Sequence, residues 1–201
     1  MSDEENGVVV FEQLRHEWMN HRAPVADHLR PGLDDSELDA VEASTGLVLP
    51  SEMRRWWGWH DGVQRRVPGT ALGPESRLGA GGWDLLSLSE ALAHRASLIE
   101  LTAEFVEDDE VRWLPEWLPV VGYDSNYLFI TAGAPRAPHS SVRLWARTPD
   151  DPYTVRAPSW IAAVAVFTEL LRGGEYTFDP SSERWNGPER LPADPNARKL
   201  L

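Results

Sequence analysis

The stretch that decides the fold is Leu49-Pro50-Ser51-Glu52-Met53-Arg54-Arg55-Trp56-Trp57-Gly58-Trp59-His60-Asp61-Gly62. Pro50 suits the first turn of a helix, because its φ is fixed and its missing N–H has no helical partner there. Met53, Trp56 and Trp57 fall at i, i+3 and i+4, which places three large apolar side chains on one face. The stretch is therefore predicted to form a short helix that docks through an aromatic face.

The predicted helix covers residues 50–61 and carries a signal at each end. Glu52 lies in its first turn, where a negative charge meets the positive end of the helix dipole. Gly62 can adopt the left-handed conformation that commonly closes a helix. Arg54 and Arg55 are interpreted as solvated partners of nearby carboxylates.

The residues before this helix predict two further helices. Residues 8–22 carry apolar side chains at i, i+3 and i+7, which is typical of an amphipathic helix. Residues 23–33 contain two prolines and a glycine and are predicted to be a connector. Asp34 and Glu37 have the spacing of a capping box, and Gly46 ends the helix that they begin.

The second half of the chain alternates β-formers with two helical patterns. One helix begins at Ser87 or Ser89 and runs to about residue 106, and the last is capped near Ser159 and ended by Gly173 and Gly174. The predicted strands are residues 83–86, 126–131, 141–147 and 153–156.

The stretch at residues 49–62 resembles the signature of the SUKH superfamily, which has a Leu-Pro, a short aromatic helix and a polar-polar-Gly ending. Leu-Ser-Leu-Ser-Glu-Ala-Leu at residues 86–92 and Trp-Leu-Pro-Val at residues 117–120, followed by Asn-Tyr-Leu-Phe-Ile, are similar to later segments of the family. The resemblance covers residues 33–62 and 83–175 in the family's order. Ser125 and Thr131 depart from it, since the family usually has glycine and an acidic residue at these points.

The resemblance and the periodicity together predict one α+β domain. Its elements are N-terminal helices, a mixed or antiparallel sheet of about four to six strands, and a closing C-terminal helix. The predicted organisation is a helix and connector at 1–32, the SUKH-like domain at 33–178, and a mobile Pro-rich tail at 179–201.

Composition narrows the classes of partner. The chain has 201 residues and a formal net charge of −13, which disfavours nucleic acid and anionic membranes as direct partners and permits steering toward a basic protein. The alternative interpretation is that the acidity only keeps the protein soluble. Cysteine is absent, which excludes disulfides and thiol catalysis, and no cofactor or metal is expected.

The same composition bears on location and source. The N-terminus is acidic and only briefly apolar, and no stretch approaches 18 apolar residues without a charge, so we expect a cytoplasmic protein with no membrane insertion. Lys199 is the only lysine, and alanine and proline are abundant, as in the proteins of a high-GC bacterium.

Four residues at the end of the decisive stretch are candidates for partner binding: Trp57, Trp59, His60 and Asp61. Trp56, Trp57 and Trp59 cannot all face one way on a helix of 3.6 residues per turn. Either all three cover the sheet, or one ring is a contact anchor beside Asp61. Trp is common among the residues that dominate binding energies.

The second group of candidates is the acidic run Glu107-Asp108-Asp109-Glu110. It is either a solvated turn or a negatively charged region that attracts a basic protein, since complementary charges raise association rates.

An enzyme is the least favoured class. His60 and Asp61 could share a proton or a metal, but a site needs at least one more ligand or a nucleophile. The alternative is that His60 interacts with the helix end and Asp61 starts a turn. The sequence has no Gly-x-Ser-x-Gly, phosphate loop or dinucleotide fingerprint.

The resemblance implies a non-catalytic protein-binding module. The superfamily joins fungal cell-wall regulators of the Smi/Knr type to bacterial proteins, many of them immunity proteins against toxins. The expected function is therefore an immunity-type protein that neutralises a basic toxin domain, such as a nuclease. The alternatives are a regulator or scaffold of the cell-wall-control type and, third, a hydrolase that uses His60 and Asp61.

Overall fold

A computed structural model describes residues 3–64, 73–79, 82–104, 112–123, 125–146 and 155–187. The helices of these residues are α1 (Asp3–Asn20), α2 (Val25–His28), α3 (Asp35–Thr45), α4 (Ser51–Trp59), the short 3-10 helix η1 (Pro74–Ser76), α5 (Leu88–Glu104) and α6 (Trp160–Arg172). The strands are β1 (Asp84–Leu85), β2 (Trp117–Tyr123), β3 (Asn126–Thr131), β4 (Val142–Trp145), β5 (Val155–Ala157), β6 (Thr177–Asp179) and β7 (Arg184–Asn186).

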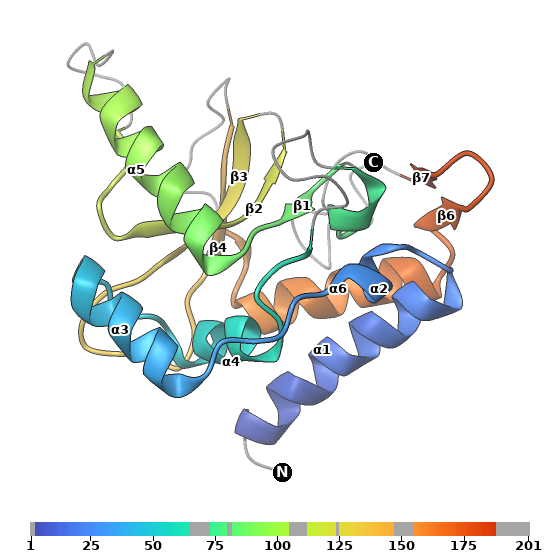
Figure 1. The fold of residues 1–201 in the computed structure, drawn as a ribbon, viewed down its shortest axis with the longest axis horizontal. Coiled ribbons are helices and arrows are strands. Elements are labelled where there is room, and N and C mark those ends of the chain that lie inside the picture. The colour runs from blue at the N-terminus through green and yellow to red at the C-terminus, as the bar shows by residue number, and fades with distance from the viewer. Residues whose placement is uncertain are drawn as a thin grey trace.

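The first five strands form an antiparallel sheet in the order of the chain (Figure 1). The helix α5 packs against β2, and α1 packs against α6 and α4. Because the sheet is antiparallel and the helices α1 to α4 precede it in the chain, the expected α+β class is confirmed. The sheet has a strand count within the predicted range, and α6 is the closing helix.

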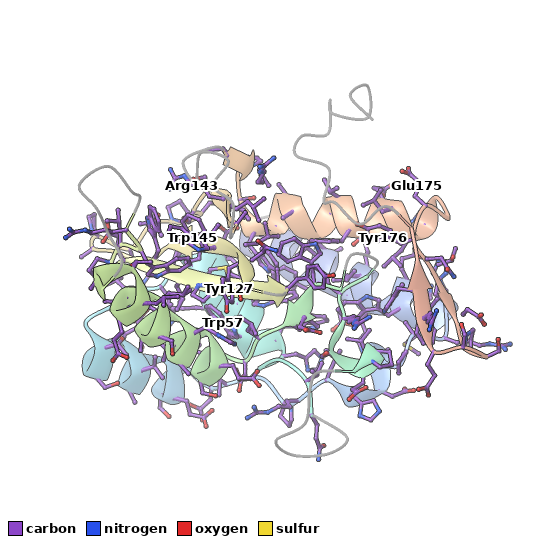
Figure 2. All side chains as sticks on the ribbon, turned by 90° about the horizontal axis from the view of Figure 1, so that it is seen from above. Trp57, Tyr127, Arg143, Trp145, Glu175 and Tyr176 are labelled. Carbon is purple, nitrogen blue, oxygen red and sulfur yellow. The ribbon has the colours of Figure 1, made fainter. Side chains whose placement is uncertain are left out.

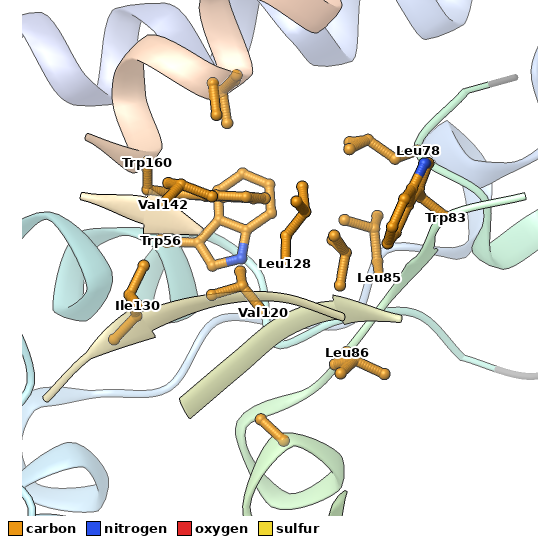
Figure 3. Packing of buried hydrophobic residues seen from close by; sticks show 14 of the residues in the cluster. Trp56, Leu78, Trp83, Leu85, Leu86, Val120, Leu128, Ile130, Val142 and Trp160 are labelled. Carbon is orange, nitrogen blue, oxygen red and sulfur yellow. The ribbon is translucent and has the colours of Figure 1, made fainter. Parts of the chain in front are cut away.

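The core between the helices and the sheet is built around tryptophan. Trp56 of α4 meets Trp160 of α6 edge to face at a centroid distance of 5.1 Å and Phe11 of α1 at 5.0 Å. Figure 3 shows Trp56 among buried residues of the sheet that include Leu128 and Val120. Such edge-to-face pairs add to the free energy gained from burying the ring areas.

The helix ends follow the sequence signals in three places. Asp34 accepts a hydrogen bond from the Glu37 N–H, and Glu37 accepts one from the Asp34 N–H, so the capping box is confirmed. Ser87 forms the equivalent reciprocal pair with Glu90, which settles the choice between two serines. Ser159 caps α6 through the N–H of Ala162.

The predicted limits of α4 were wrong at both ends. Pro50 is the N-cap, with φ −54° and ψ 147°, rather than the first helical residue. The helix ends at Trp59, and His60 is already extended. Gly62 has a φ of 69°, but it does not end the helix. A Cβ at this position would lie 2.6 Å from the Ser87 nitrogen. The lack of a side chain at Gly62 lets the chain after α4 pass close to the start of α5.

The segment after α6 begins with a hairpin. The strands β6 and β7 pair antiparallel, and the rings of Phe178 and Trp185 meet at 5.3 Å. The hairpin occupies the first part of the predicted tail at 179–201, and residues 188–201 lie outside the described part of the chain. The boundaries proposed at residues 33 and 179 stay predictions.

Glu52 ties the start of α4 to two distant segments. Its side chain is fully buried and accepts hydrogen bonds from the Ser140 N–H at 2.7 Å and the Ile161 N–H at 3.2 Å. His139 lies 3.4 Å from the same carboxylate. A buried carboxylate needs such donors, so Glu52 fixes the loop before β4 and the first turn of α6 against α4.

Replacing Glu52 by glutamine is expected to lower the free energy of unfolding by about 2 kcal/mol. Glutamine keeps the shape but replaces one acceptor oxygen by a donor, which leaves a backbone N–H without its charged partner. Urea unfolding followed by tryptophan fluorescence measures the change. The exposed Glu37→Gln provides the comparison, and an equal loss in both variants would contradict the structural role of Glu52.

Candidate functional site

The structure removes Trp57 from the candidate partner surface. Its side chain is fully buried, and its Nε1 donates to the Leu86 carbonyl at 3.2 Å. Figure 2 shows its place within the molecule. A ring with no exposed surface cannot contact a partner, so Trp57 is a core residue.

Trp59 remains accessible. Its ring is half-buried against Phe11 and Trp56, at centroid distances of 5.6 and 5.4 Å, and its Nε1 donates to Glu12 at 2.6 Å. These contacts hold the ring in one orientation at the end of α4. Trp59 is therefore a rigid aromatic side chain with one part open to a partner.

His60 and Asp61 do not converge on a common point. The His60 Nδ1 lies 2.6 Å from the Arg30 carbonyl, which fixes that nitrogen as the donor. Asp61 is only 3% exposed, and it accepts from the Leu88 N–H at 2.7 Å and lies 3.2 Å from Arg30. Asp61 therefore joins the turn after α4 to the start of α5 and is not open to a partner.

Burial raises the pKa of Asp61, although the Leu88 N–H and the Arg30 charge oppose the shift. A raised pKa means that the folded state holds this proton more tightly than the unfolded chain. The wild type should therefore gain stability relative to Asp61→Asn as the pH falls from about 7 toward about 4. Urea unfolding of both proteins across this range tests the sign, and a difference that stays constant with pH would contradict it.

The second group of candidates, Glu107, Asp108, Asp109 and Glu110, lies outside the described residues. The two interpretations of this run stay open. Within the described chain, exposed carboxylates cluster on the first turns of α3 and at its N-cap. Asp34, Asp35, Glu37 and Asp39 are all exposed there.

A broad groove of about 1160 Å³ is lined by residues of α1, α3 and α4. Figure 1 shows α4 between these two helices, α1 and α3. The floor of the groove is α4, with Gly58 exposed and Trp59 beside it. Val8 of α1 lies on one side. The other side consists of α3 residues and the preceding chain, namely Leu33, Asp34, Asp35, Leu38 and Asp39.

The α3 wall is held by a cluster of charges that we call the Glu42 clasp, formed by Glu42, Arg54 and Arg136. Arg136 donates to Glu42 at 2.7 and 2.8 Å, and Arg54 donates to it at 3.1 Å. Burial would raise the pKa of Glu42, but the hydrogen bonds from Arg136 and Leu49 and the two arginine charges lower it overall. The clasp therefore carries its charges at neutral pH and fixes α3 beside α4.

Arg54 also reaches two exposed carboxylates of α3. It lies 3.0 Å from Asp35 and 2.8 Å from Asp39, whose side chains are 93% and 68% exposed. Each of these contacts uses the Oδ1 atom of the carboxylate. The interpretation of Arg54 as a partner of nearby carboxylates is thus confirmed, whereas Arg136 had no recognisable signal in the sequence.

Among the residues that the structure describes, no group of three or more histidine or acidic side chains could hold a metal ion. In the same part of the chain, no helix is both long enough and apolar enough to cross a membrane.

The N-terminal helices, the antiparallel sheet and the charged groove over the aromatic helix α4 define a small α+β protein. The SMI1 / KNR4 family (SUKH-1) model matches residues 32–165, and the chain belongs to this family. The match runs from the residues before α3 into α6, so α1 lies outside it. A comparison with curated proteins found no match.

Proposed function

We propose that this protein is a non-catalytic immunity-type module that binds a basic toxin domain and blocks it. Family membership supports a SUKH-type role. A basic partner is proposed because the carboxylates of α3 are exposed beside the groove, on a chain with a net charge of −13. Close complementary charges speed association and fix the orientation of the partner.

The geometry of His60 and Asp61 supports a binding role over the hydrolase alternative. Both oxygens of the buried Asp61 carboxylate are engaged by Leu88 and Arg30, and the His60 Nδ1 is directed at the Arg30 carbonyl, so Asp61 is not free to act with His60 on a bound substrate. General acid–base catalysis requires the group to reach the proton that it transfers.

The test is affinity purification of the tagged protein from its own cells, read by mass spectrometry. One basic protein at near one-to-one yield supports the proposal, and co-expression should then restore growth of cells that carry the captured protein. Several substoichiometric envelope or signalling proteins would instead favour the cell-wall regulator. Trp59→Ala is the surface variant, because Trp57→Ala would disrupt the core.

A further inference from the structure

We propose that the groove over α4 is the docking site for a basic, arginine-bearing segment of the partner protein. This inference rests on the proposed function and names the surface that would carry it. The groove is open along α4 because Gly58 has no side chain. An incoming side chain can therefore lie directly on the helix between the α1 and α3 walls.

The groove offers two features that an arginine side chain prefers. The first is the half-buried Trp59 ring, since a guanidinium stacks on a tryptophan face. The second is the pair Asp35 and Asp39, whose contacts with Arg54 are through Oδ1. Because these side chains are 93% and 68% exposed, an incoming guanidinium can reach both carboxylates and donate to them.

The lining of the groove is balanced in formal charge, because Asp34, Asp35 and Asp39 are matched by three arginines. Glu42, which pairs with two of these arginines, adds one further negative charge beside the groove. The lining arginines are three, and two of them, Arg54 and Arg136, belong to the Glu42 clasp. The third, Arg55, lies against α1, where its Nε would be 3.2 Å from a Cβ at Gly7.

Apolar residues supply the remaining contact area. Val8 is 43% exposed on α1, and Leu33 and Trp59 also line the groove. Because α1 lies outside the residues that the family model matches, one wall comes from the matched region and the other does not. A partner that contacts both walls would contact residues inside and outside the matched region.

Gly58 allows a sharp test of the groove. A Cβ at this position meets only the Leu33 carbonyl oxygen, at the ordinary contact distance of 3.5 Å. Gly58→Gln therefore keeps the fold, since glutamine favours helices more than glycine does, and its side chain fills the floor of the groove. Ala40→Gln adds the same side chain to an exposed position of α3 that does not line the groove.

The probe is a fluorescent helical peptide with arginine and leucine on one face, measured by anisotropy at low salt. We expect Gly58→Gln to weaken its binding about tenfold, Ala40→Gln to leave it unchanged, and citrulline in place of arginine to abolish it. Equal binding to both variants, or no binding to the wild type, overturns the groove proposal. Circular dichroism checks that both variants are folded.

The same variants separate this inference from the proposed function. If a basic partner is captured equally well by the wild type and Gly58→Gln, the function stands and the groove proposal fails. If the peptide shows the expected pattern but no partner neutralised by the protein is found, the groove stands and the immunity function fails.

Discussion

Replacing Gly32 by alanine is expected to lower the free energy of unfolding by about 3 kcal/mol, the upper end of the usual cost of overpacking. A Cβ at this position would lie 1.8 Å from the Gly58 carbonyl oxygen and 2.4 Å from its carbon. Both atoms belong to the backbone, so the segment before α3 and the end of α4 would have to separate. That separation would also stretch the hydrogen bond from the Leu33 N–H to the Trp57 carbonyl.

The matched control is Gly58→Ala, on the other side of the same contact. Its Cβ has ordinary clearance, and alanine reduces the entropy of the unfolded chain, so we expect a gain of about 0.5–1 kcal/mol. Urea unfolding of the wild type and the two variants measures both changes. Similar stabilities for Gly32→Ala and Gly58→Ala would show that the close approach of the two segments is not rigid.

Replacing Trp57 by alanine is expected to cost about 3–5 kcal/mol, the range observed when large aromatic side chains are removed from a core. The ring is fully buried and contributes the indole donor to the Leu86 carbonyl. Its loss would leave a cavity and remove that hydrogen bond between α4 and the residues before α5. Thermal and urea unfolding with circular dichroism provide the measurement.

Trp59→Ala is the comparison for Trp57. The Trp59 ring is half-buried, and its indole donates to Glu12 near solvent, so we expect a smaller loss of about 1–2 kcal/mol. A loss for Trp59→Ala as large as that for Trp57→Ala would mean that Trp59 is also an integral core residue. It would then be unsuitable as a surface variant in the capture experiment.

Trp57 and Trp59 lie on different faces of the same helix, α4. The chain after Met53 presents Trp56 and Trp57 to the core, and the helical turn carries Trp59 away from it toward α1 and the groove. A binding role for this surface thus depends on a ring that the core holds rigid from one side. Rigid aromatic anchors lose little entropy when a partner binds.

Much of the fold could be predicted because its signals are local. The spacing of Asp34 and Glu37, the cap at Ser159 and the β-forming run at residues 126–131 depend on neighbours within a few residues. The order of such signals also supported the family, which the matching family model confirms over residues 32–165.

The candidate site was predicted less well because exposure is a property of the packed molecule. Trp57 and Asp61 were chosen for their chemistry, and both are buried by segments about 30 residues away in the chain. Trp59 is half-buried and borders the groove. Its role as a binding residue stays a prediction, like those of His60 and the acidic run.

The sequence by itself determined the main helices, the strands near residues 126–131 and 141–147, and the caps at Asp34 and Ser159, since periodicity and capping act over short distances. The short helix α2 and the hairpin of β6 and β7 had no predicted counterpart, and the α+β class rested also on the family resemblance. Only the tertiary structure decided which tryptophan is accessible and where the carboxylates gather. The Glu42 clasp joins residues 94 positions apart, and Glu52 bonds to a residue 109 positions away. No local pattern encodes such pairs, because they form only when the sheet and the helices around it are in place.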